Sequence, residues 1–188
     1  MLKICKYLLL IPMCICIASC GSTGENGVGT TVKVSASIKD GTSISSFFAI
    51  GTPGNFGNGS LSYSIKSDIL PHPNGIVSSS VMITTAKISY TPLPDSSGSI
   101  SPALPPFTKA VGLTVSAGGT GAVDNMNVTS STVIQYLYDN FIAPPTGLLN
   151  VAGMQFNYIV VVEFSGYEIN SGASITCDQA VGNMYVTK

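Results

Sequence analysis

The side chains that could perform chemistry in this chain are few, and their spacing assembles no known catalytic set. His72 is the only histidine, and it stands between Pro71 and Pro73. A serine-histidine-aspartate triad would have to use His72, yet the chain contains no Gly-x-Ser-x-Gly nucleophile motif. We therefore interpret His72 as an exposed loop residue, and we expect that the protein is not an enzyme.

Metal ligands are equally scarce. Zinc and copper sites need several His or Cys ligands, and His72 with Cys177 cannot supply them. The segment Asp124-Asn125-Met126-Asn127 offers side-chain oxygens, but it lacks the central Gly and the closing Glu of a calcium loop, so we interpret it as an Asx-rich turn. Glu163 and Glu168 are five residues apart and would point to opposite faces of a strand, which does not favour paired-carboxylate hydrolysis. We expect no metal ion and no cofactor.

Two other features could bind a partner. Six tyrosines could offer flat stacking platforms for a carbohydrate or another ligand if several shared an exposed face; otherwise they border the core. They are Tyr63, Tyr90, Tyr136, Tyr138, Tyr158 and Tyr167. The proline-rich stretch from Pro102 to Pro106 could be a polyproline-type recognition strand, or a rigid cover over a sheet edge.

The first nineteen residues have the pattern of an export signal. Lys3 and Lys6 precede an uncharged run of 13 residues from Tyr7 to Ser19. A helix that spans a membrane needs about 20 apolar residues, and Pro12 interrupts this shorter run. The pattern therefore predicts a cleaved signal peptide. The run ends Ile17-Ala18-Ser19, directly before Cys20-Gly21.

This ending resembles the lipobox of bacterial lipoproteins, in which a branched apolar residue and two small residues precede the cysteine that is lipidated. The resemblance implies that residues 1–19 are removed and that Cys20 carries acyl chains, of which two or more hold a protein stably in a bilayer. Gly21 stands where the family's inner-membrane retention signal has Asp, which favours the outer membrane. The expected location is thus the bacterial cell envelope, on its periplasmic or surface face. The alternative is a plain signal peptide with Cys20 incidental.

Composition narrows the range of partners. Charged residues make up 9% of the chain, against about 25% in typical soluble domains. After residue 19 there are six Lys, no Arg and nine carboxylates, so the net charge is 6 − 9 = −3. Nucleic-acid binding needs clustered basic charge, so we expect none. A basic patch that could bind anionic lipid is also missing, so the acyl chains alone would anchor the protein in the membrane.

Cys177 is the only cysteine after Cys20, so a mature chain whose Cys20 carries acyl chains cannot form an internal disulfide. A single cysteine in a strand is usually a small buried hydrophobic residue, although a reactive thiol or an intermolecular bridge is the alternative. Residues 20–30 comprise the lipidated Cys20 and a Gly-rich tether with a reach of about 18 Å. Residues 31–188 suit a single domain.

Alternating apolar and polar residues predict strands along most of this domain. The expected strands are 32–38, 47–50, 61–65, 80–91 with a bulge near Thr84-Thr85, 111–115, a central strand 156–164 covered on both faces, and a final hairpin of 173–177 with 181–186. Loops are expected over 51–60, 68–75, 92–106 and 118–127. Residues 132–141 are ambiguous, with β-branched residues favouring a strand over 132–138 and a helical turn near Phe141 as the alternative.

These elements predict an all-β fold: an antiparallel β-sandwich of about 7–9 strands with long Gly/Pro-rich loops. The spacing is loosely similar to that of Ig-like and fibronectin type III sandwiches, although the core Trp of those folds is absent. We expect a lipid-anchored envelope protein with a non-catalytic structural or protein-interaction role. Its partner could be another envelope protein, a glycan or a second copy, because edge strands with little charge permit self-association. A ligand- or carbohydrate-binding lipoprotein is the alternative.

Overall fold

The computed structural model contains nine strands and one helix in the part of the chain that it describes. The described residues are 30–39, 43–47, 59–71, 77–94, 98, 101–137 and 155–187. The elements are β1 (Val32–Ile38), β2 (Ser43–Phe47), β3 (Ser60–Ile69), β4 (Val81–Leu93), β5 (Phe107–Val115), β6 (Thr120–Asn127), α1 (Ser131–Leu137), β7 (Gln155–Glu168), β8 (Ser174–Thr176) and β9 (Ala180–Thr187).

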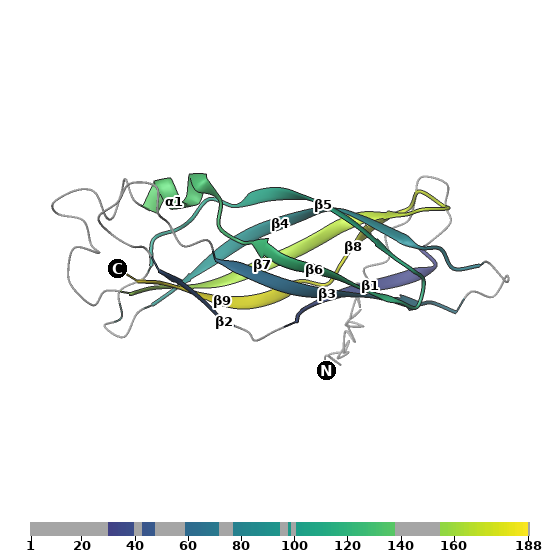
Figure 1. Cartoon of the computed structure of the whole chain (residues 1–188), viewed down its shortest axis with the longest axis horizontal. Coiled ribbons are helices and arrows are strands. Elements are labelled where there is room, and N and C mark those ends of the chain that lie inside the picture. The colour runs from purple at the N-terminus through teal and green to yellow at the C-terminus, as the bar shows by residue number, and fades with distance from the viewer. Residues whose placement is uncertain are drawn as a thin grey trace, which may run out of the picture.

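The strands form two sheets that pack face to face along the long axis of the molecule (Figure 1). One sheet has the order β1-β3-β6, and the other has the order β2-β9-β7-β4-β5, with β8 also paired to β7. Neighbouring strands are antiparallel except β2 and β9, which run parallel. The chain crosses between the sheets several times, as immunoglobulin-like sandwiches do. The predicted all-β sandwich is therefore confirmed.

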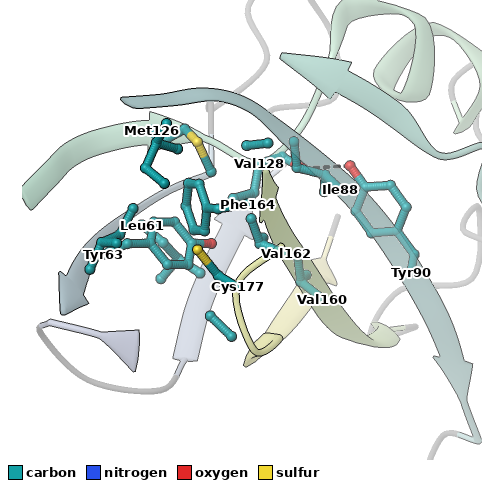
Figure 2. Packing of buried hydrophobic residues seen from close by; sticks show 14 of the residues in the cluster. Leu61, Tyr63, Ile88, Tyr90, Met126, Val128, Val160, Val162, Phe164 and Cys177 are labelled. Carbon is teal, nitrogen blue, oxygen red and sulfur yellow. Dashed lines mark hydrogen bonds between the residues drawn. The ribbon is translucent and has the colours of Figure 1, made fainter. Parts of the chain in front are cut away.

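The core lies between the two sheets (Figure 2). Tyr63 of β3 and Phe164 of β7 meet edge to face, with ring centroids 5.2 Å apart. Both rings are fully buried, as are Val160 and Val162 on the same face of β7. Each large apolar side chain buried in this way stabilises the fold by about 1.5–3 kcal/mol, so the contact between β3 and β7 holds the sheets together.

Strand β7 is central, as the sequence predicts, with β4 on one side and β9 on the other. Its inward face is buried from Phe156 to Phe164, but Ile159 and Val161 are only half-buried. The expectation that both faces are covered is therefore wrong, because the second sheet lies against one face only. The predicted bulge in β4 is confirmed, since the register shifts between Ile83 and Thr85.

Residues 131–137 form the helix α1, so the strand preferred for 132–138 is wrong over this range. The Ser130 hydroxyl caps the helix by accepting a hydrogen bond from the N–H of Val133 at 3.1 Å. Val133 is 1% exposed and packs into the core. A cap and one core contact outweigh the β propensity of the segment.

The Gly-rich segment predicted as a connection over 118–127 contains strand β6 instead. Its residues pair with β3 from Thr120 to Asn127. The sequence shows no alternating apolar pattern here because this edge strand buries few apolar side chains. Met126, 3% exposed, is the buried residue of β6. Strands β3 and β4 also run past their predicted ends, to Ile69 and Leu93.

The predicted final hairpin is wrong. Strands β8 and β9 do not pair with each other; both pair with the same edge of β7. Between them the chain bulges at Asp178, which forms an isolated bridge to Ser35 of the other sheet. An ion pair of 3.4 Å between Lys33 and Asp178 lies at the same place, so the bulge links the two sheets.

Candidate functional site

The tyrosines do not form one exposed stacking face. Tyr63 and Tyr158 are fully buried, and Tyr90 is 9% exposed. The Tyr90 hydroxyl donates a hydrogen bond to the carbonyl of Val128 (Figure 2). Burial raises the pKa of Tyr63, Tyr90 and Tyr158. These three rings serve the core and cannot stack on a ligand.

The exposed tyrosines are far apart in the fold. Tyr136 belongs to α1, whereas Tyr167 stands near the end of β7 opposite Met82 of β4. Figure 1 places α1 at one end of the sandwich and the close of β7 toward the other. Tyr138 lies outside the described residues. Tyr136 and Tyr167 are therefore not arranged to hold a sugar ring between them.

Residues Asp124 to Asn127 form a bulge in β6 and not a cation loop. The register between β3 and β6 shifts here, and Asn125 has a φ of 51°. The Asn125 N–H donates to the Ser62 hydroxyl at 3.2 Å, and Asp124 pairs with Lys39 at 3.2 Å. Within the described ranges no three His, Cys, Asp or Glu side chains gather closely enough to bind a metal ion.

Glu168 is the centre of a buried polar cluster that the sequence did not predict. Its side chain is fully buried at the end of β7, while Glu163 on the same strand is half-buried. One carboxyl oxygen accepts hydrogen bonds from the N–H of Thr31, at 2.8 Å, and from the Thr31 hydroxyl. The other accepts from the Ser171 hydroxyl at 2.5 Å. Glu168 continues the parity of Phe156 to Phe164, which is the signal that places it inward.

Further bonds extend this cluster to the start of β4. The N–H of Ser79 donates to the Thr31 hydroxyl at 3.3 Å, and the N–H of Asn170 donates to the Ser79 hydroxyl at 3.0 Å. The carboxyl oxygens thus have donors from the chain itself, and Glu168 lines neither of the two cavities described below. We interpret the cluster as structural.

Cys177 is 3% exposed and packs into the core, as the hydrophobic interpretation predicts. Burial, with a smaller effect from the charge of Asp178, raises the pKa of the Cys177 thiol to about 12. A thiol that stays protonated is a poor nucleophile. Cys177 is therefore suited to packing and not to reaction.

The remaining candidates divide in two. His72 and the expected lipidation site Cys20 lie outside the described residues.

The proline-rich stretch that follows Ser101 lies against the sheet. Leu104 is 7% exposed and belongs to the core cluster, and the Ser101 hydroxyl donates a hydrogen bond to the Leu93 carbonyl at 2.8 Å. That hydroxyl also accepts from the N–H of Asn157 at 2.9 Å. This arrangement agrees with a rigid segment that covers the sheet, and not with a free polyproline-type recognition strand.

A groove of about 300 Å³ lies between β5 and β6. Each of these strands is the last in its sheet, so each has one edge that pairs with no described strand. Five consecutive residues of each strand line the groove, 109–113 and 122–126. Consecutive lining residues include both faces of a strand, so backbone edges as well as side chains border the groove. A second cavity, of about 20 Å³ between β1 and β8, holds no more than a water molecule.

The floor of the β5/β6 groove is apolar. Val111 and Leu113 of β5 and Val123 of β6 are half-buried and pack against the core. Lys109 lies on the same inward-facing parity of β5, half-buried, and forms no ion pair with a described residue. The sequence does not reveal this site, because the Gly-rich stretch that forms β6 has the composition of a connection.

Comparison with known protein families and with curated proteins finds no match for this chain. None of the helical segments in the described part has the length and apolar character needed to cross a membrane.

Proposed function

We propose that this chain is a lipid-anchored protein of the bacterial cell envelope, with a non-catalytic structural or protein-interaction role. The lipobox pattern that ends at Cys20 supports the anchor. The first described strand begins at Val32, so every described element follows the expected tether. The proposed location is the outer membrane, where the acyl chains would hold the domain.

The β5/β6 groove is the observation that carries the interaction role. A strand edge offers a row of unpaired N–H and C=O groups, and an extended segment of a partner can add to it. Here two such edges border one hollow with half-buried Val111 and Leu113 at its floor. An added strand with alternating apolar side chains would cover that floor while pairing with β5 or β6.

The charge of Lys109 restricts which partner strand could bind in the β5/β6 groove. An inward-pointing charge on an edge strand opposes pairing with an ordinary apolar strand, because the ammonium group would lose water without gaining a partner. A strand that brings a carboxyl group to Lys109 removes this cost. The groove therefore favours a partner segment with an acidic residue over pairing between two copies of β5, which carries no acidic residue.

The interaction role can be tested by site-specific photo-crosslinking in living cells. A photoreactive residue at Ala110, exposed beside the groove, should give an adduct of defined mass, and Lys109→Glu should abolish it. The control places the same residue at Val181 of β9, which is 53% exposed away from the groove. Equal adducts at both positions, or none at Ala110, would contradict a role for the groove.

The anchor can be tested separately by fractionation. The chain with Cys20 should stay with the membranes after a wash at high salt, because acyl chains are held by the hydrophobic effect and not by charge. Cys20→Ser should appear in the soluble fraction. Retention of the serine variant would show that something other than lipid on Cys20 holds the protein.

A further inference from the structure

Exposed large apolar side chains gather at one end of the sandwich. Seven such side chains occur in the described part of the chain, and five of them belong to segments that meet near Thr31. The five are Ile69 (56% exposed), Leu70 (37%), Val77 (83%), Tyr167 (41%) and Ile169 (47%). We call this surface the Thr31 end.

Hydrogen bonds show that these residues share one end although they come from distant parts of the sequence. The N–H of Leu70 donates to the Thr31 carbonyl at 2.9 Å, and the N–H of Ile169 donates to the Ser80 carbonyl at 2.9 Å. Ser79, two residues after Val77, donates its N–H to the Thr31 hydroxyl. Ile69 lies against Gly118 of the turn between β5 and β6.

The Thr31 end exposes no charged side chain among its described residues. These residues are 30–31, 69–71, 77–81, 116–120 and 167–174, and they include one charged residue, Glu168, which is fully buried. Exposed charges begin directly beyond these residues: Asp68 precedes Ile69 and pairs with Lys66, and Lys33, two residues after Thr31, pairs with Asp178. Apart from the apolar side chains, this end is largely Ser, Thr and Gly.

The place where the chain enters the fold identifies what covers this surface. Ten residues lead from Cys20 to Thr30, and a chain of that length reaches no further than about 35 Å even when fully extended. The 14 residues of β7 alone extend over about 46 Å. A lipid on Cys20 therefore keeps the Thr31 end nearer to the bilayer than the α1 end of the molecule. A short tether also gives an effective concentration in the millimolar range, so a weak contact is enough.

We propose that the Thr31 end contacts the bilayer surface, with Leu70, Val77 and Ile169 at the boundary between headgroups and acyl chains. The orientation rests on the lipid anchor proposed above. Apolar and Tyr side chains are the groups that favour this boundary, and none of the described residues would carry a charge into it. The long axis of the sandwich then stands away from the membrane, and the β5/β6 groove lies on its side, accessible to other proteins.

The contact can be tested with vesicles of phosphatidylcholine whose acyl chains carry bromine, which quenches tryptophan at close range. The chain contains no Trp, so Val77→Trp and Tyr136→Trp each introduce a single reporter, the second on α1. Every described helix and strand follows residue 30, so a chain that begins at Cys20 keeps the whole described fold. Coupling of Cys20 to a maleimide lipid supplies the anchor, because buried Cys177 does not compete.

The proposal predicts several-fold stronger quenching in the Val77→Trp chain than in the Tyr136→Trp chain, unchanged by high salt or by added phosphatidylglycerol. Ile169→Ser in the Val77→Trp chain should lower the quenching, with near-ultraviolet circular dichroism confirming the fold. Equal quenching of the two reporters would overturn the proposal. So would a dimer of the unanchored chain that Ile169→Ser disperses, because a second copy would then cover this surface. Since the anchor is supplied chemically, failure here is distinct from failure of lipidation at Cys20.

Discussion

Thr31 and Glu168 are joined by two hydrogen bonds to one carboxyl oxygen, although 137 positions separate them in the sequence. The bonds fix the start of the first described strand, at the point where the chain leaves the expected tether, to the end of the central strand β7. Any load that a membrane anchor places on the domain enters at this contact. A fully buried carboxyl group is costly unless its oxygens have donors, and here Thr31 and Ser171 supply them.

Glu168→Ala should therefore lower the free energy of unfolding by about 3 kcal/mol, because it leaves the Thr31 N–H without its acceptor. Glu168→Gln keeps one acceptor oxygen and should cost less. Urea unfolding measures both. The control is Glu163→Gln on the same strand, half-buried, which should change stability by no more than about 0.5 kcal/mol. Equal effects at the two positions would contradict the role of the cluster.

Gly166 lies where β7 passes the bulge of β4. A Cβ at this position would stand 1.9 Å from the Met82 carbonyl oxygen and 2.8 Å from the Ile83 Cα. Both are backbone atoms, so the strands would have to separate, and Gly166→Ala should cost about 3 kcal/mol or more. Gly112→Ala on the edge strand β5, where nothing lies within 4 Å, should be nearly neutral. Thermal unfolding compares the two, and an unchanged melting temperature for Gly166→Ala would contradict the close approach.

Two buried tyrosines form a matched pair for testing hydrogen bonding in the core. Tyr90 and Tyr158 meet edge to face at 6.3 Å, but of the two only Tyr90 has a hydroxyl partner, the Val128 carbonyl. Tyr90→Phe should destabilise the fold by about 2 kcal/mol, because it removes the hydroxyl donor of a buried carbonyl. Tyr158→Phe removes a hydroxyl that has no partner, so it should be neutral or stabilising. Chemical denaturation measures the free energy of unfolding of both variants. A larger loss of stability in Tyr158→Phe than in Tyr90→Phe would contradict the structure.

The raised pKa of Cys177, about 12 against an ordinary value of 9, predicts a pH dependence. The folded state binds the thiol proton more tightly than the unfolded state does. The contribution of this group to stability is therefore complete below pH 9 and is lost as the pH rises toward about 12.

Labelling with a thiol reagent gives the direct check on Cys177. In the Cys20→Ser chain that lacks residues 1–19, the native protein should react slowly at pH 8, and addition of urea should release the full reactivity of one thiol. Rapid labelling of the native protein would show that Cys177 is accessible.

The sequence indicated strands wherever one face is apolar and the other polar. The change of parity between Ile83 and Ile88 even located the bulge in β4, because an extra residue is the one way to keep both side chains inward. Strand β6 was missed because its pairing depends on the backbone of β3 and on few apolar side chains of its own. The C-terminal pairing was missed because one bulge at Asp178 sends β8 and β9 to the same neighbour.

The candidate surfaces could not be predicted from local patterns. The β5/β6 groove exists because two strands in different sheets each end their sheet on the same side. The Thr31 end brings Leu70 and Ile169 together across about half of the chain. By contrast, the expected anchor is a local signal at Cys20 that is complete within the first 20 residues, whereas the described structure begins after it.

Mass spectrometry of the amino-terminal peptide from the membrane-associated protein tests the lipid anchor most directly. We expect a peptide that begins at Cys20 and carries acyl chains on the cysteine, with residues 1–19 removed. A peptide that begins at an unmodified Cys20, or a chain that retains residues 1–19, would contradict it.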